Sequence, residues 1–134
     1  MENLWPKLEK VDLTTPKAIL AQQAEYFNSL ETGLQAVIAS KQVVNEHEGY
    51  EEEEESFRFV HTLRIKANAM GGFMIPLLSA DHKPTSLYPV RIWNYLSGKS
   101  AKATNEKELL DSLRTIFQSK EAVDAIQNMI VQSK

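Results

Sequence analysis

The run from Phe57 to Asn68, FRFVHTLRIKAN, alternates between two sets of side chains. Successive side chains of a β-strand point to opposite faces, so a period of two places one set on the core side of a sheet and the other on the solvent side. The first set is Phe57, Phe59, His61, Leu63, Ile65 and Ala67, and the second is Arg58, Val60, Thr62, Arg64, Lys66 and Asn68. The chain is therefore expected to build a sheet around this strand.

Glycines and prolines constrain how the sheet continues. Gly71 and Gly72 suit a tight reversal, because glycine reaches positive φ without steric cost, so FMIPLLSA is expected to return as the second strand of a long hairpin. After the turn-like DHKPTS, the segment from Leu87 to Trp93 is expected to be a further short strand. Pro76 and Pro89 remove ladder donors and favour edges or bulges. This conflicts with the internal place that a simple meander would give the strand of Pro76.

Two regions carry helix signals. An N-terminal helix is expected to begin at Pro16, with Thr15 as its N-cap, and to end near Gly33. Its apolar stripe is Ile19, Leu20, Ala24, Phe27 and Leu30. Near the C-terminus, Asn105 and Glu108 suit the reciprocal capping of one helix, and Ser119 suits the N-cap of another. The apolar faces of these two helices are Leu109, Leu110, Leu113, Ile116 and Phe117, followed by Val123, Ile126, Met129 and Ile130.

The segment from Leu34 to Val44 could continue the N-terminal helix, but Gly33 and the valines favour a strand. The order helix, strands, helices predicts an α+β fold. We expect an antiparallel sheet of three to four strands, with an N-terminal helix and one or two C-terminal helices packed on one face. With 134 residues, we expect a single domain over 1–134, in which 46–55 is an acidic loop and 97–104 a polar linker.

The composition narrows the class of protein. Hydrophobic residues make up 43% of the chain and charged residues 25%, and no apolar run approaches the roughly 20 residues that a bilayer requires. The absence of cysteine removes disulfides, thiolate metal sites and cysteine nucleophiles. The start, MENLWPKLEK, holds no apolar stretch of signal-peptide length. We therefore expect a cytoplasmic protein without a membrane segment.

Acidic charge is concentrated in one block. Seven of the ten residues from Glu46 to Glu55 are glutamate, whereas the rest of the chain carries all 15 Lys and Arg residues against 11 of the 18 Asp and Glu residues. A run of like charges stays hydrated. We interpret the block as a solvated connection between two strands that lies near the basic strand face and weakens unwanted anion binding. The alternative is specific docking onto basic residues.

No motif of catalytic or cofactor-binding specificity is found in the sequence. Ser97–Ser100, SGKS, resembles the end of a phosphate-binding loop, but Trp93 stands where the first glycine of that loop is required. His47, His61 and His82 match no compact metal-ligand spacing. We interpret His47 and His82 as surface residues and His61 as a hydrogen-bonded core residue. We predict no catalytic, cofactor-binding or metal-binding residues, and no enzyme activity.

The remaining feature is a basic strand face. Arg58, Arg64 and Lys66 recur at even spacing, and Arg91 belongs to a later strand that could lie nearby. We interpret these four residues as an interaction surface, on which aromatic side chains for stacking on bases are not evident. The sequence favours a non-enzymatic module that offers a sheet face or an edge strand to a protein partner or to its own copy. Nucleic-acid binding through the basic face is the alternative, and no small-molecule ligand is inferred.

Several segments also follow one another in a characteristic order. They are LWP near the start, TPKAILAQQA at the first helix, FRFVHTLRI in the main strand, LYPV, and a final helix before QNMIVQS. In this order the chain resembles a group of small uncharacterised bacterial cytosolic proteins of unknown function. The resemblance implies a fold shared by stand-alone bacterial proteins, some of them encoded among multi-gene defence or mobile-element loci. It implies an accessory or partner-binding role and carries over no catalytic residue.

Overall fold

The computed structural model describes residues 1–44 and 57–134. The acidic block from Glu46 to Glu55 and His47 lie outside the described residues, so their predicted roles stay predictions. The elements, in chain order, are α1 (Pro16–Asn28), β1 (Gln35–Val44), β2 (Phe57–Ala67), the short 3-10 helix η2 (Asn68–Met70), β3 (Phe73–Lys83), β4 (Ser86–Asn94), β5 (Lys99–Ala103), α2 (Glu106–Phe117) and α3 (Lys120–Gln132).

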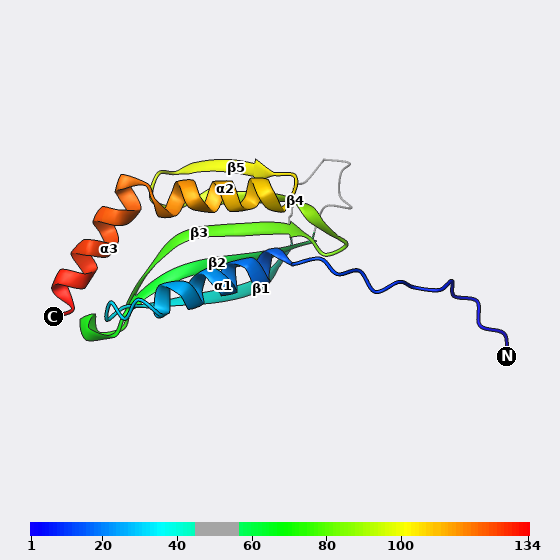
Figure 1. The fold of residues 1–134 in the computed structure, drawn as a ribbon, viewed down its shortest axis with the longest axis horizontal. Coiled ribbons are helices and arrows are strands. Elements are labelled where there is room, and N and C mark those ends of the chain that lie inside the picture. The colour runs from blue at the N-terminus through cyan, green and yellow to red at the C-terminus, as the bar shows by residue number, and fades with distance from the viewer. Residues whose placement is uncertain (45–56) are drawn as a thin grey trace.

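The strands form one antiparallel sheet in the order β1-β2-β3-β4-β5 (Figure 1). The predicted α+β class is confirmed, with an N-terminal helix and two C-terminal helices, but the sheet has five strands instead of three to four. The additional strand is β5, which lies within the segment 97–104 that was expected to be a polar linker. Gly98 turns the chain at φ 71°, and Lys99 then pairs with Asn94. The segment is polar because β5 is an edge strand in which only Ala103 is buried.

The sheet accommodates both prolines where its ladder is irregular. β3 is internal, and Pro76 lies opposite Arg64, next to a register shift that leaves Leu77 as an extra residue. Such a bulge locally interrupts the ladder, which removes the conflict that Pro76 posed. Pro89 follows a cis peptide bond in a part of β4 where the pairing with β3 is also shifted.

The predicted helix starts are confirmed. Thr15 Oγ1 accepts a hydrogen bond from the Ala18 N–H at 3.0 Å, and Pro16 takes the first helical position. Asn105 Oδ1 accepts a hydrogen bond from the Glu108 N–H at 2.9 Å and so caps α2. The Glu108 carboxylate accepts from the N–H of Thr104 and not from that of Asn105.

The end of α1 comes earlier than predicted. Asn28 Nδ2 donates to the carbonyl of Ala36 at 3.2 Å, and its Oδ1 accepts from the Ala36 N–H at 2.7 Å. These two bonds tie the last residue of α1 to β1. Leu30 consequently lies beyond the helix and is 67% exposed, so its assignment to the apolar stripe is wrong. The segment from Leu34 to Val44 is a strand, as favoured.

The helices lie on one face of the sheet (Figure 1). α1 packs on β1 and β2, and α2 packs on β4 and β5. The core lies between these two helices and the sheet. α3 contacts α2 and buries only Ala122 and Met129. No helix among the described residues is long and apolar enough to cross a membrane.

Candidate interaction surfaces and a buried histidine pair

The sheet face opposite the helices, here called the open face, carries the basic residues predicted from the sequence. Arg58, Arg64 and Lys66 alternate along β2 with residues of the core face. Val60 lies opposite Asp81, and Asp81 lies opposite Arg91, so all three strands present these positions on the same face. The structure therefore brings Arg91 onto the predicted basic face, with β3 between it and β2.

Asp81 joins two of these arginines. Its Oδ1 accepts hydrogen bonds from Arg58 Nε and from Arg91 Nε, the latter at 3.0 Å. The side chains of Arg58 and Asp81 are only 11% and 14% exposed, whereas Arg91 is 58% exposed. One carboxylate thus partly neutralises the centre of the open face. The sequence interpretation placed Asp81 in a turn, but β3 continues through Lys83.

Aromatic side chains lie beside the basic residues of the open face. Trp93 is two residues beyond Arg91 on β4 and is 40% exposed. Its ring meets that of Tyr95 edge to face, with centroids 6.5 Å apart and an interplanar angle of 90°. The expectation that no exposed aromatic side chain accompanies the basic face was therefore wrong. The alternation Arg91, Trp93, Tyr95 was readable in the sequence.

A chain of polar side chains crosses the opposite, helix-facing side of β1, β2 and β3. Ser40 Oγ lies 2.8 Å from His61 Nδ1, the Nε2 atoms of His61 and His82 are 3.2 Å apart, and His82 Nδ1 lies 2.8 Å from the carbonyl oxygen of Lys83. Both imidazoles are 5% exposed. His61 is thus a hydrogen-bonded core residue, as predicted. The surface position predicted for His82 is wrong, because the residue belongs to β3 and not to a turn.

The partners of this chain determine which ring nitrogens carry protons. A backbone carbonyl can only accept, so His82 Nδ1 donates to Lys83, and the neutral ring then accepts at Nε2. His61 Nε2 must donate to that nitrogen, which leaves His61 Nδ1 to accept from the Ser40 hydroxyl. The Ser40 hydroxyl, the two imidazoles and the Lys83 carbonyl therefore all have hydrogen-bond partners when both imidazoles are neutral.

Burial lowers the pKa of His61 below its ordinary value of 6.5, and His82 and Lys17 lower it further, while Asp81 acts in the opposite direction. Ser40 can accept from a protonated His61, but a second proton on His82 Nε2 would face the N–H of His61. Within the described residues, no group of three or more His, Cys, Asp or Glu side chains is placed to bind a metal ion. We interpret the histidine pair as a structural link between three strands.

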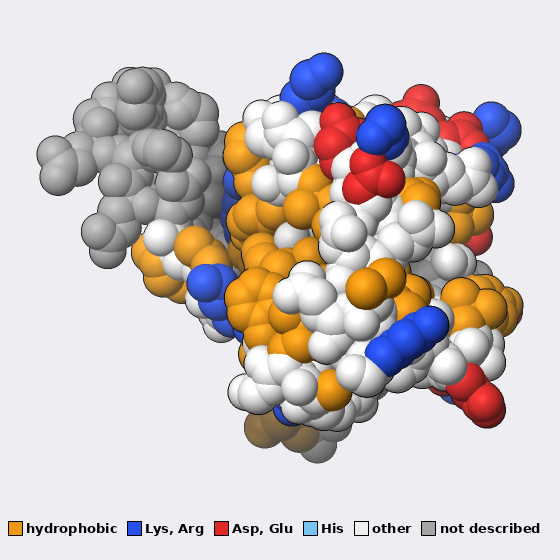
Figure 2. Space-filling view, turned by 90° about the vertical axis from the view of Figure 1, so that its left-hand side faces the viewer, with side chains coloured by type: hydrophobic (Ala, Val, Ile, Leu, Met, Phe, Trp, Pro, Cys, Tyr) orange, Lys and Arg blue, Asp and Glu red, His pale blue; other side chains and the backbone are white. Residues whose placement is uncertain are grey.

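An apolar groove with a volume of about 460 Å³ lies between the C-terminal half of α1 and α3. Sheet residues at its base are Ala36, Leu63, Ile65 and Leu77. Residues at its sides include Tyr26, Phe27 and Leu30 near α1, and Val123, Ile126 and Ile130 on α3. Figure 2 shows hydrophobic side chains open to solvent on the side of the molecule where α3 lies. The predicted apolar face of α3 therefore borders an open groove and is only partly buried.

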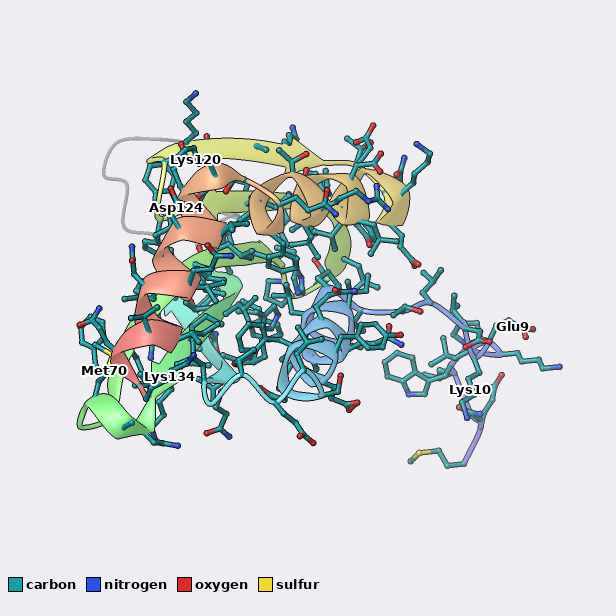
Figure 3. The ribbon with its side chains drawn as sticks, turned by 60° about the vertical axis from the view of Figure 1, so that its left-hand side comes forward. Glu9, Lys10, Met70, Lys120, Asp124 and Lys134 are labelled. Carbon is teal, nitrogen blue, oxygen red and sulfur yellow. The ribbon has the colours of Figure 1, made fainter. Side chains whose placement is uncertain are left out.

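A second apolar feature is the chain that precedes α1, residues 1–14, here called the arm. It contains no helix or strand and extends away from the folded body (Figure 1), and Figure 3 shows Glu9 and Lys10 on it, well apart from the sheet and helices. Its large apolar side chains are exposed: Leu4 by 83%, Trp5 by 77% and Leu8 by 76%. No role was expected for these residues from the sequence. Their spacing was the available signal.

No family model matches the chain, and no curated protein or solved structure shows significant similarity to it. The resemblance of its segments to small bacterial proteins consequently stays a prediction.

Proposed function

We propose that the protein is a non-enzymatic interaction module that holds an apolar segment of a partner protein, its own copy included, in the groove between α1 and α3. The observation that carries the proposal is the groove, which has a volume of about 460 Å³ and is lined mainly by apolar side chains, with Gln23, Thr32 and Gln127 as its polar members. Large exposed apolar surfaces on soluble proteins mark binding sites, and an amphipathic helix laid into such a groove is a recurrent mode of recognition.

The sheet edges suit a partner less well than the groove does. β5 is short and carries Lys99 and Lys102, and lysines on a short edge strand discourage pairing with another strand. On β1, the other edge strand, the Asn28 side chain already occupies the N–H and the carbonyl of Ala36. The proposal therefore replaces the sheet face or edge strand favoured from the sequence with a groove on the helix side.

An accessory role in the bacterial cytoplasm belongs to the same proposal. It is supported by the resemblance of the segments and by the absence of cysteine, which suits a reducing compartment.

The proposal can be tested with a displayed library of helix-forming peptides. Val123 lines the groove and is 38% exposed, whereas Val131 is 67% exposed on the same helix and is not part of the lining. We expect the wild-type chain to select peptides with apolar residues at helical spacing. Their affinity should fall about tenfold or more for Val123→Glu and stay unchanged for the matched control Val131→Glu. Failure to select such peptides, or equal binding by both variants, contradicts the proposal.

A second candidate function, nucleic-acid binding by the open face, is favoured by the position of Trp93 beside Arg91. Single-stranded nucleic acids bind to surfaces that combine basic side chains with aromatic rings on which bases stack. In fluorescence anisotropy with an unstructured oligonucleotide, Trp93→Ala is expected to weaken binding by about tenfold, and Arg64→Gln to reduce its salt dependence. Lys107→Gln, on α2, serves as the control. Absence of binding even at low salt excludes this function.

A further inference from the structure

We infer that the arm of one copy of this chain occupies the apolar groove of a second copy. The inference rests on the proposed function and names its partner. Among the described residues, the groove of about 460 Å³ and the arm, in which Leu4, Trp5 and Leu8 are each more than three-quarters exposed, are both uncovered in a single chain. The groove offers an apolar surface for docking, and the arm offers apolar side chains that could fill it.

The arm has the pattern of a helix that binds in a groove. Leu4, Leu8 and Val11 are spaced i, i+4 and i+7, and Trp5 lies next to Leu4, so a helical arm would present these side chains on one face. Lys10 falls on the opposite face. Short helices of this length are marginal in water without a packing surface. The arm therefore needs a docking surface to become helical, which agrees with its lack of a helix or strand.

One contact of the kind that caps a helix is present near the start of the arm. Asn3 Oδ1 accepts a hydrogen bond from the N–H of Trp5 at 3.1 Å, which is the contact that an asparagine N-cap makes with the second residue of a helix. Pro6 would then lie in the first turn, where the missing N–H of a proline costs no intrahelical hydrogen bond. Trp5, which precedes this proline, is disfavoured in the helical region, so docking of the arm has to offset this local cost.

The path of the chain favours a second copy over the same copy. The groove lies beside the C-terminal half of α1, whereas the arm leaves from the N-terminal end of α1 and extends away from the body (Figures 1 and 3). Thr15 is extended, with ψ 154°, because its side chain caps α1 and because a residue that precedes proline avoids the helical region. A return to its own groove would require a reversal just before this residue, in a stretch without glycine.

Exchange of arms between two copies gives a closed dimer. Each copy supplies one arm and one groove, so a two-fold dimer satisfies both arms and both grooves at once. The 15 residues before α1 can span about 50 Å when extended, a distance comparable to the width of a small domain. A closed dimer is therefore within reach of the arms.

Light scattering of the full-length chain over a range of concentrations tests the inference. The wild-type mass is expected to rise from one chain to two. Leu8→Glu on the arm and Val123→Glu in the groove are each expected to raise the dimer dissociation constant about tenfold or more. Lys10→Glu and Val131→Glu are controls of the same chemistry on the two surfaces that are not used, and both should dimerise like the wild type.

Mixing the two defective variants distinguishes exchange from other dimers. Leu8→Glu keeps an intact groove and Val123→Glu keeps an intact arm, so an equimolar mixture contains one functional pair and should form a heterodimer that neither variant forms with itself. A dimer that both variants retain, or a mixture without heterodimers, overturns the inference. A wild-type chain that stays monomeric at all concentrations also overturns the inference. This holds even if Trp5 fluorescence shows that the arm has docked on the body of its own copy. Peptides selected by the groove in any of these cases would leave the proposed function standing.

Discussion

Replacing Asp81 by asparagine is expected to destabilise the fold through its effect on Arg58. The two side chains are part-buried, at 14% and 11% exposed, and removing one partner of a fully buried ion pair typically costs about 3–5 kcal/mol. Two features reduce this cost. Asparagine still offers a neutral acceptor, and the backbone carbonyl of residue 81 still accepts from Arg58 Nη2, at 3.3 Å. We therefore expect the free energy of unfolding to fall by about 1.5–3 kcal/mol.

The length of the chain allows this loss in the free energy of unfolding to be expressed as a decrease in melting temperature. An unfolding entropy of about 2.1 cal/mol/K per residue makes each kcal/mol worth roughly 3.6 °C for a chain of 134 residues. The predicted loss thus corresponds to a decrease of roughly 5–11 °C. Urea unfolding followed by circular dichroism gives the free energy directly, because the midpoint shifts while the slope stays constant.

Asp111→Asn is the matched control for this measurement. Asp111 accepts from Lys107 Nζ at 3.3 Å and from Arg114 Nη1 at 2.9 Å on the surface of α2, where it is 51% exposed. Exposed ion pairs contribute little to stability, so no measurable loss is expected. If Asp81→Asn and Asp111→Asn unfold at the same urea concentration, the interpretation of the Arg58–Asp81 pair as a part-buried structural link is wrong.

Two further predictions concern the connections of β1 and β2. Asn28→Ala removes both side-chain hydrogen bonds to Ala36 and is expected to lower the free energy of unfolding by about 1–2 kcal/mol. Asn128→Ala on α3 is the near-neutral control, and equal urea midpoints for the two variants would contradict the prediction. Because the folded state lowers the pKa of His61, the unfolded state binds a proton more readily. Stability should therefore be greatest above pH 6.5 and fall as the pH drops through 6.5 toward the folded pKa. His61→Gln should show a smaller fall in stability between neutral and mildly acidic pH, and an unchanged pH dependence would count against the role of His61.

Features that depend on neighbours in the sequence were predictable. The caps at Thr15, Asn105 and Ser119 involve contacts within a few residues, and the structure contains each of them. The period of two in β2 holds from Leu63 to Ala67, whereas Phe57 and Phe59 are exposed near the start of the strand and Thr62 is buried. The end of α1 was not predictable from such signals. It is determined by Asn28, whose side chain bonds to a residue eight positions away, so Gly33 was a misleading signal for the end of the helix.

Features that depend on strand register were missed for the same reason. The Arg58–Asp81–Arg91 cluster requires three strands in a particular alignment, and the pairing of His61 with His82 requires β3 to extend to Lys83. The residues DHKPTS have turn composition, which concealed the last positions of β3. The polar segment 97–104 concealed β5, because an exposed edge strand needs few apolar residues.

The apolar groove illustrates a deeper limit of sequence patterns. Val123, Ile126, Met129 and Ile130 have helical spacing, and such a stripe predicts a face that is covered without specifying which chain covers it. Here Met129 is 5% exposed while Val123 remains 38% exposed, so the fold covers only part of the stripe. The arm poses the converse problem, since Leu4, Leu8 and Val11 form a stripe without any body to pack on. If the stripe on the arm of one copy packs against the stripe on α3 of another copy, each stripe is left partly uncovered in an isolated copy. The mixing experiment with Leu8→Glu and Val123→Glu tests whether the two stripes pack against each other.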